Sequence, residues 1–326
     1  LYSWPMPFFG YGGQIYFGAD DGVHGWELWR SDGTPEGTAI FLDINPGRRH
    51  GGGQGFVDVG GDVVLFRAYE RVNGWEVWRT DGTAEGTRAV TNLGPQKPGQ
   101  SNARAFVDMN GIAFFAAFDP LNGDELWRSD GTAEGTFLLK NIYPGDEDAF
   151  SHYYSGWRKG RLGDVLYFEA DDPISGIELW RTDGTPEGTF LLKDINPGLE
   201  TAFPYSGIEF ARAGDTLYFP AYDGLHGIEL WRTDGTAEST RLVKDIDPLR
   251  TDALSSRPYS LTEFAGSVFF AADDGTDGAE LWRTDPIEGA VLVKDIHLGD
   301  DYGGLYLGEL FQFEGSLYFW TFENTR

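Results

Sequence analysis

The sequence predicts an all-β protein, a single β-propeller domain over residues 1–326. Three observations lead to this prediction. A unit of about fifty residues recurs along the chain, each copy contains four short β-like stretches, and no segment of useful length shows the apolar period of a helix. Because a propeller blade is a four-stranded antiparallel sheet, each copy corresponds to one blade.

The repeat is marked by the string Glu-Leu-Trp-Arg, which occurs six times with Val77 as the only substitution. Its successive tryptophans lie 49, 49, 53, 51 and 51 residues apart. These residues are Trp29, Trp78, Trp127, Trp180, Trp231 and Trp282. The repeats cover approximately residues 1–49, 50–98, 99–150, 151–201, 202–253 and 254–301, with a partial copy at 302–326.

Four strands are expected in every complete repeat. In the sixth repeat they are residues 259–265, 267–272, 279–284 and 290–296, which are rich in Val, Leu, Phe, Tyr and Trp and separated by Gly, Asp and Pro. Residues 302–323 then add a first and a second strand of a further blade. We therefore predict seven blades with the last one partial, and six blades with the tail packed along the closure as the alternative.

The third strand is expected to be buried on both faces because blade sheets stack face to face. Side chains alternate along a strand, so leucine and tryptophan of the string point to opposite faces, and tryptophan fills the gap between blades. Its buried indole N–H requires a hydrogen-bond acceptor. Glutamate and arginine of the string also lie on opposite faces. We therefore predict ion pairs between neighbouring blades, formed by residues such as Glu27 and Arg30 and their equivalents.

The segment Asp-Gly-Thr-x-Glu-Gly-Thr after the third strand is typical of a tight turn into the fourth. Aspartate bonds backbone N–H groups two residues on, and glycine accepts positive φ. The motif begins at Asp32, Asp81, Asp130 and Asp183. It is altered at Ser239 in the fifth repeat and broken at Pro286 in the sixth.

Two stretches, residues 27–38 (ELWRSDGTPEGT) and 178–189 (ELWRTDGTPEGT), resemble the bacterial ELWxxDGT repeat family. The resemblance covers six units and nearly the whole chain. It implies a secreted or surface-attached bacterial protein, of a kind sometimes described as hyalin-like, and hence an extracellular or cell-surface location. It implies no catalytic residues that can be transferred to this chain.

The net charge and the composition restrict the kinds of partner that the protein can bind. The chain has 25 Lys and Arg against 52 Asp and Glu, a net charge of −27. A field of this sign repels nucleic acid and anionic membrane surfaces, and favours cations or a basic partner. No apolar run approaches the roughly 18–20 residues that span a bilayer, so no membrane insertion is expected. With no cysteine, disulfides and thiolate chemistry are excluded.

The candidate ligand-binding residues lie in the connections from fourth to first strands, which vary most between repeats. Loops that vary on a rigid frame are where specific sites are built. Aromatic and charged side chains there can stack on sugars or anchor a protein. They are His152, Tyr153, Tyr154, Trp157, Arg158, Tyr205, Tyr259 and Tyr306. The alternative is that the tyrosines pack the ends of inner strands.

Carboxylates also recur in the second-to-third hairpins, at Asp20, Asp21, Asp171, Asp172, Asp273 and Asp274. Ca²⁺ takes six to eight oxygen ligands from such residues and from turn carbonyls, so calcium is a candidate cofactor. The spacing differs from an EF-hand loop, and aspartates that cap their own turns are the alternative.

These features favour a non-catalytic binding or scaffolding module over an enzyme, recognising a protein or glycan through its variable-loop face. Gly-x-Ser-x-Gly, a P-loop and clustered His or Cys ligands are absent from the sequence. One alternative is a carbohydrate-active hydrolase or lyase with carboxylates at the central channel. The other is a structural subunit of a surface layer or filament.

Overall fold

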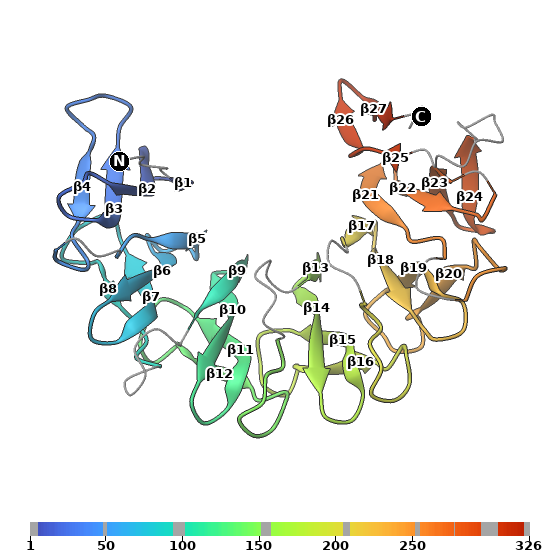
Figure 1. Ribbon diagram of the computed structural model, residues 1–326, viewed down its shortest axis with the longest axis horizontal. Coiled ribbons are helices and arrows are strands. Elements are labelled where there is room, and N and C mark those ends of the chain that lie inside the picture. Colours follow the sequence, from blue (N-terminus) through green and yellow to red (C-terminus); the bar gives the residue numbers. More distant parts are fainter. Residues whose placement is uncertain are drawn as a thin grey trace. The chain divides into compact units, whose positions relative to one another are not determined.

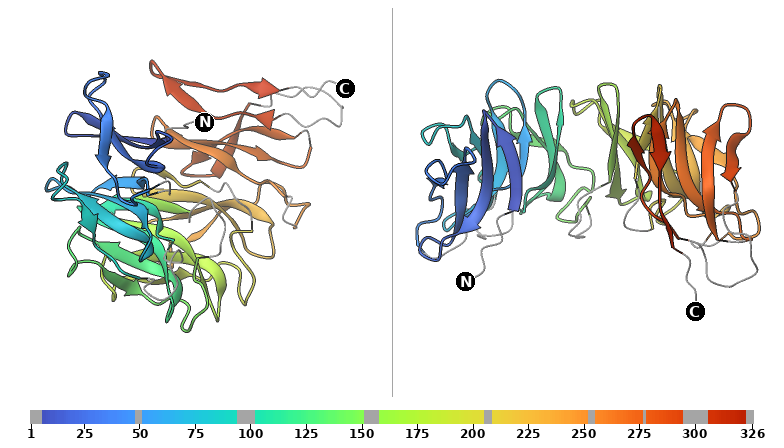
Figure 2. Two further views of the ribbon diagram at one scale, coloured as in Figure 1. Left: turned by 60° about the vertical axis from the view of Figure 1, so that its left-hand side comes forward. Right: turned by 90° about the horizontal axis from the view of Figure 1, so that it is seen from above.

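A computed structural model describes residues 6–47, 51–93, 102–150, 158–204, 209–251, 255–276, 278–294 and 306–322. Its regular elements are β-strands, paired antiparallel (Figures 1 and 2). No helix in the described part of the chain is long and apolar enough to cross a membrane. The chain divides into two compact units, Leu1–Gly156 and Trp157–Arg326.

The first unit contains three four-stranded sheets. The first sheet is β1 (Met6–Tyr11), β2 (Gln14–Asp20), β3 (Trp26–Ser31) and β4 (Ala39–Leu42). The second is β5 (Gln54–Asp58), β6 (Val64–Glu70), β7 (Gly74–Thr80) and β8 (Arg88–Ala89). The third is β9 (Arg104–Met109), β10 (Ile112–Asp119), β11 (Gly123–Ser129) and β12 (Phe137–Lys140). In each sheet, spatial order follows chain order.

The second unit contains three more such sheets. The fourth sheet is β13 (Lys159–Leu162), β14 (Val165–Asp172), β15 (Gly176–Thr182) and β16 (Phe190–Lys193). The fifth is β17 (Ala211–Ala213), β18 (Thr216–Tyr222), β19 (Ile228–Thr233) and β20 (Arg241–Lys244). The sixth is β21 (Tyr259–Phe264), β22 (Ser267–Asp273), β23 (Ala279–Asp285) and β24 (Gly289–Lys294). Two small pairs follow, β25 (Tyr306–Leu307) with β28 (Thr321–Phe322), and β26 (Phe311–Phe313) with β27 (Ser316–Tyr318).

The predicted fold class is confirmed: the protein is all-β and consists of four-stranded antiparallel propeller blades. Six complete sheets and the small C-terminal pairs give a blade count of six to seven. The strands expected in the sixth repeat match β21 to β24 to within two residues at each end. The single-domain organisation stays a prediction.

Consecutive sheets within a unit pack through the leucine of one and the tryptophan of the next. In the first unit Leu28 of β3 shares an apolar cluster with Phe66 and Trp78 of the second sheet. In the second unit Leu179 of β15 is clustered in the same way with Trp231 of β19. The two faces of the third strand are therefore both buried, as the alternation of its side chains dictates.

The predicted ion pairs between neighbouring blades are wrong. In the first five sheets the glutamate is buried, and it accepts hydrogen bonds from backbone amides just after the fourth strand of its own sheet. Oε2 of Glu178, for example, lies 2.7 Å from Ile195 N, and Oε1 lies 3.0 Å from Asn196 N. The arginine lies over a phenylalanine of the fourth strand in three sheets, at 5.2 Å from the ring centroid. These arginines are Arg30, Arg128 and Arg181.

Within the described residues, the expected acceptor for the indole N–H is found in one sheet. Nε1 of Trp29 donates to the carbonyl of Ala19 at 3.0 Å. In the other five sheets the indole nitrogen is buried and has no partner among the described residues. A buried donor without a partner costs about 1–3 kcal/mol of folding free energy. The stabilisation from apolar packing of the indole ring must exceed this cost.

The turn motif is closed by its own side chains. In the fourth sheet, Oδ1 of Asp183 accepts from the N–H of Thr185 at 2.9 Å and from its hydroxyl at 2.7 Å. That hydroxyl in turn accepts from Gly188 N, and the hydroxyl of Thr189 donates to the Thr185 carbonyl. A Cβ at Gly188 would lie 2.0 Å from Asp183 Oδ1, which explains the glycine.

We expect Asp183→Ala to lower the free energy of unfolding by about 1–2 kcal/mol, because it removes both hydrogen bonds to Thr185. Urea denaturation measures the change. Glu187→Ala is the matched control, since Glu187 lies in the same turn and its side chain is exposed; its effect should stay within about 0.5 kcal/mol. Equal effects of the two substitutions would contradict a structural role for the aspartate.

Candidate functional site

Each sheet has two different ends. Because the strands run antiparallel in chain order, the first-to-second and third-to-fourth turns meet at one end, here called the turn face. The second-to-third hairpin and the connection to the next sheet meet at the other, here called the loop face. The two described pockets both lie on turn faces.

The larger pocket is a groove of about 1100 Å³ between the first two sheets of the first unit. Tyr11 at the end of β1 and Tyr16 of β2 form its aromatic wall. Tyr16 is buried and packs edge-on against Phe41, with ring centroids 5.4 Å apart. Asp58 and Asp62, at the turn between β5 and β6, line the opposite side.

The groove is strongly acidic. Four aspartates and one arginine line it, a net charge of −3; they are Asp32, Asp58, Asp62, Asp81 and Arg30. Burial raises the pKa of Tyr11, and the charges of Asp62, Asp58 and Asp81 raise it further. Hydrogen bonds from Thr83 lower the pKa of Asp81, so this carboxylate stays ionised. At neutral pH the groove therefore presents negative charge beside neutral phenol rings.

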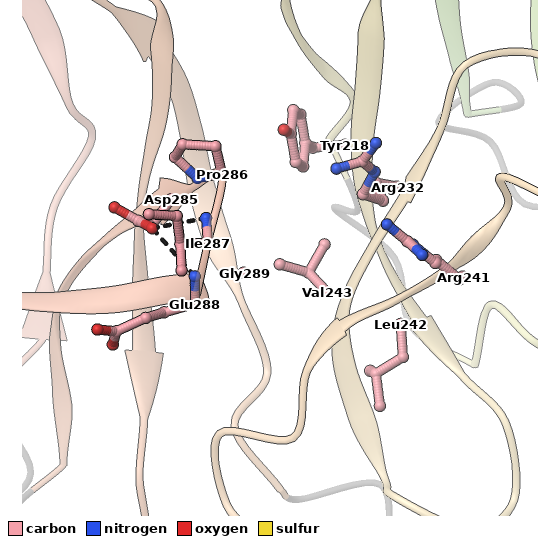
Figure 3. Close-up of a pocket in the computed structure, with 10 residues that line it drawn as sticks. All are labelled: Tyr218, Arg232, Arg241, Leu242, Val243, Asp285, Pro286, Ile287, Glu288 and Gly289. Atoms are coloured by element: carbon pink, nitrogen blue, oxygen red, sulfur yellow. Dashed lines mark hydrogen bonds between the residues drawn. The ribbon is translucent and has the colours of Figure 1, made fainter.

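The second pocket, of about 310 Å³, occupies the corresponding position between the β17–β20 and β21–β24 sheets (Figure 3). It is lined by Tyr218, Arg232 and Arg241 on one side. The other side is the altered turn that contains Pro286 and Ile287. Unlike the groove of the first unit, this pocket has two guanidinium groups on one wall.

On the loop face, two charged residues interrupt the repeat. The second-strand position opposite the leucine or valine of the string carries Arg67 and Glu169 in two sheets, but Gly, Ala or Pro in the other four. Arg67 bonds Gln54 Oε1 at 2.6 Å. Glu169 forms an ion pair with Arg158 at 2.6 Å, and its pKa is raised because burial outweighs the favourable charge of that arginine.

Three of the predicted ligand-binding residues lie within the part of the chain that the structure describes. Arg158 bonds Glu169 and also donates to the Phe203 carbonyl at 3.1 Å. Tyr259 begins β21 and packs against the cluster of Ala271, Leu281 and Leu310, as the packing alternative expects. Tyr306 is in β25, paired with Phe322. The residues outside the described chain are His152, Tyr153, Tyr154, Trp157 and Tyr205.

The aspartates considered for calcium bond their own hairpins. Oδ1 of Asp172 accepts from Ile174 N and Ser175 N, both at 2.8 Å, and Oδ1 of Asp273 accepts from Gly275 N at 2.7 Å. Asp20, Asp21 and Asp274 accept from backbone N–H groups in the same way. Within the described residues no group of three or more His, Cys, Asp or Glu side chains could hold a metal ion. These five aspartates thus accept hydrogen bonds within their own turns, and a calcium-binding role stays a prediction.

Sequence reasoning missed the acidic groove. Its residues come from the turns of two successive repeats, and a single repeat shows only half of it. One signal was available: tyrosine recurs at the same second-strand position as Tyr16, Tyr167 and Tyr218. Each of the three pairs across the strands with the arginine of the string, which indicates a shared environment.

Comparison with protein families corrects the predicted membership of the ELWxxDGT family. The family model that matches is that of outer membrane protein assembly factor BamB, over residues 17–146. This match covers less than half of the chain. No curated protein sequence matches the chain.

Solved structures give distant similarities. A puromycin hydrolase is 15% identical over 83% of this chain and 42% of its own, with a TM-score of 0.45. TolB from Acinetobacter baumannii is 12% identical over 85% and 62%, with a TM-score of 0.36. Oligopeptidase B from Leishmania major is 10% identical over 94% and 43%, with a TM-score of 0.46. The chain thus spans less than two thirds of each of these proteins, and similarity at this level says nothing about activity.

Proposed function

We propose that this chain is a non-catalytic protein-binding module of the bacterial cell envelope, and that the acidic groove of the first unit binds a basic segment of a protein partner. The observation that supports this most directly is the groove's net charge of −3 beside the rings of Tyr11 and Tyr16. The match to the BamB family model over residues 17–146, which includes most of the groove, agrees with a protein partner in the envelope.

The chemistry of the groove suits lysine and arginine side chains. Carboxylates attract the cation, and a phenol ring adds a cation–π contribution of about 0.5–1 kcal/mol at an exposed site. Complementary charge also accelerates association and discriminates against acidic partners. The net charge of −27 acts in the same direction over the whole molecule.

Buried carboxyl groups with raised pKa values are typical of general acids, but here they serve the architecture. Burial raises the pKa of Glu125 and Glu178 to about 8 and of Glu27 and Glu229 to about 7. Each bonds backbone amides of its own sheet. A group that recurs at the same position in successive sheets supports the fold of each sheet, whereas an active centre needs one unique arrangement.

The double variant Asp58→Asn, Asp62→Asn tests the groove. We expect it to weaken binding of a fluorescein-labelled Lys/Arg-rich peptide about tenfold, measured by anisotropy in low-salt buffer. The matched control is Asp164→Asn, Asp215→Asn, which removes the same charge from exposed first-to-second turns of the second unit. Equal weakening by both variants would show that only net charge matters and would overturn the groove assignment.

A glycan partner predicts a different result in the same assay. Neutral oligosaccharides would then displace the peptide, and binding would depend on the ring of Tyr11 more than on Asp58 and Asp62. Surface-layer or filament assembly would instead appear as concentration-dependent growth in light scattering of the purified protein.

A further inference from the structure

We propose a second binding site, outside the acidic groove and independent of its proposed function: the pocket between the β17–β20 and β21–β24 sheets binds the carboxylate of an acidic peptide segment. The pocket has a volume of about 310 Å³. This volume accommodates one acidic side chain and its neighbouring residues, and it is too small for the surface of a folded protein.

The cationic wall of the pocket is one transverse row across three strands. Tyr218 of β18 is directly opposite Arg232 of β19, and Arg232 is directly opposite Arg241 of β20. Figure 3 shows the phenol and both guanidinium groups on one side of the pocket. Two like charges at directly opposite positions of an antiparallel pair repel each other, so this row is unfavourable without an anion.

Neither arginine of this pair has an ion-pair partner among the described residues, although the charge of Asp234 acts on Arg232 from a greater distance. No carboxylate among the described residues lies within ion-pair distance of Arg232 or Arg241, and Nε of Arg232 is buried without a hydrogen-bond partner. Asp285 also lines the pocket, but its carboxylate accepts from the N–H groups of Ile287 and Glu288. In Figure 3 the carboxylates of Asp285 and Glu288 point away from the arginines.

Two departures from the repeat coincide at this pocket. The position of Arg241 is occupied by Phe137 and Phe190 in two other sheets, where the ring stacks under the arginine of the string. The second departure is Pro286, which replaces the glycine that elsewhere approaches the preceding sheet. A Cβ on Gly235, for example, would lie 2.5 Å from the hydroxyl of Tyr167.

A comparison within the chain shows that an arginine pair alone does not make the pocket. Arg79 and Arg88 are also directly opposite each other, in the second sheet. There Arg79 donates to the carbonyl of Gly131 in the next turn at 3.3 Å, so its guanidinium is engaged by the protein itself. Arg232 faces the altered turn at Pro286, and no such bond from Arg232 is found among the described residues.

The lining favours a peptide as the carrier of the carboxylate. Arg and Tyr donate to both oxygens of a carboxylate, with arginine able to do so bidentately. Val243, Pro286 and Ile287 add apolar surface, and Ile287 is 92% exposed. Apolar contacts next to the cation suit an acidic residue flanked by aliphatic side chains better than a hydrated sugar acid.

The test uses the whole chain and a short fluorescein-labelled peptide that alternates leucine and glutamate, at physiological ionic strength, where screening reduces the repulsion from the overall negative charge. We expect the wild-type chain to bind this peptide. Arg241→Phe should weaken the binding at least about tenfold, because a hydrogen-bonded charged pair is lost. Arg241→Phe recreates the stacked Arg–Phe pair of the third and fourth sheets, so the fold should persist. Arg241→Gln is a second variant. The melting temperature of each variant shows whether it remains folded.

Arg88→Phe is the matched control and should leave peptide binding unchanged. The proposal is overturned by unchanged affinity in both Arg241 variants, by equal binding of a leucine–glutamine peptide, or by binding of oligogalacturonate without binding of the peptide. The acidic groove is tested by a basic peptide and by variants of the first unit, so either site can fail without the other.

Discussion

Trp231→Ala should lower the free energy of unfolding by about 3–5 kcal/mol, the cost of removing a large side chain from a packed core. The indole is 7% exposed and shares a cluster with Leu179, Leu217 and Phe219. It joins two successive sheets, so its loss leaves a cavity between them. Thermal or denaturant unfolding of the purified chain measures the change.

Two further variants separate packing from hydrogen bonding. Trp29→Ala should cost less, because Trp29 is only half-buried and its N–H is bonded to Ala19. Trp231→Phe should also cost less than Trp231→Ala, since it keeps a ring and removes a buried N–H that has no acceptor among the described residues. If Trp29→Ala and Trp231→Ala were equally destabilising, the contact between successive sheets would not be the source of the effect.

Glu178→Ala should cost about 2–5 kcal/mol near pH 6, because it leaves two buried amides, those of Ile195 and Asn196, without an acceptor. Glu178→Gln retains one carbonyl acceptor and should cost less. Circular dichroism on urea titration gives both values. A cost below about 1 kcal/mol for the alanine variant would mean that water replaces the carboxylate at these amides.

The same glutamates set a pH dependence. Burial raises the pKa of Glu178 in the folded state to about 8, above its ordinary value of 4.5. Protonation is therefore favoured by folding, and this contribution to stability is present below about pH 4.5 and lost as the pH rises through about 8. With three equivalent glutamates shifted in the same direction, the melting temperature of the wild type should fall between about pH 5.5 and 9.

The variant isolates the contribution of one group. The destabilisation caused by Glu178→Gln should shrink as the pH is raised over this range, because only the wild type has the carboxyl group to ionise. Aspartates of the turns, such as Asp183, have lowered pKa values and lose their contribution only in acid. A destabilisation that stays constant with pH would show that Glu178 is ionised throughout.

The architecture was predictable because one short string dictates it. The leucine and the tryptophan of the string point to opposite faces of a β-strand, and each must pack against a neighbouring sheet. The contact between Leu28 of one sheet and Trp78 of the next therefore follows from the sequence alone. The partner of Glu178 did not follow. Its amides belong to Ile195 and Asn196, which lie just beyond the end of β16. Opposite charges in a repeat suggest ion pairs, and backbone donors carry no sequence signal.

The site was less predictable than the fold. Variable loops were the natural candidates, yet both described pockets lie on the turn face, where the repeats look most alike. The groove is formed by half of one repeat and half of the next, as Tyr16 and Asp62 illustrate. Small changes in a nearly constant motif, such as Pro286, carried more information about pockets than the length of the loops.

The turns that are closed by their own side chains also bear on how such a chain can change in length. The side-chain hydrogen bonds that close the Asp183 turn stay within a few neighbouring residues, so its closure does not depend on an adjacent sheet. Duplication or deletion of one whole repeat would leave these side-chain hydrogen bonds intact in all remaining turns, and the leucine of one sheet would again meet the tryptophan of the next. Growth by gene duplication is thereby made easy, and each new copy is free to acquire a substitution such as Arg241 or Pro286.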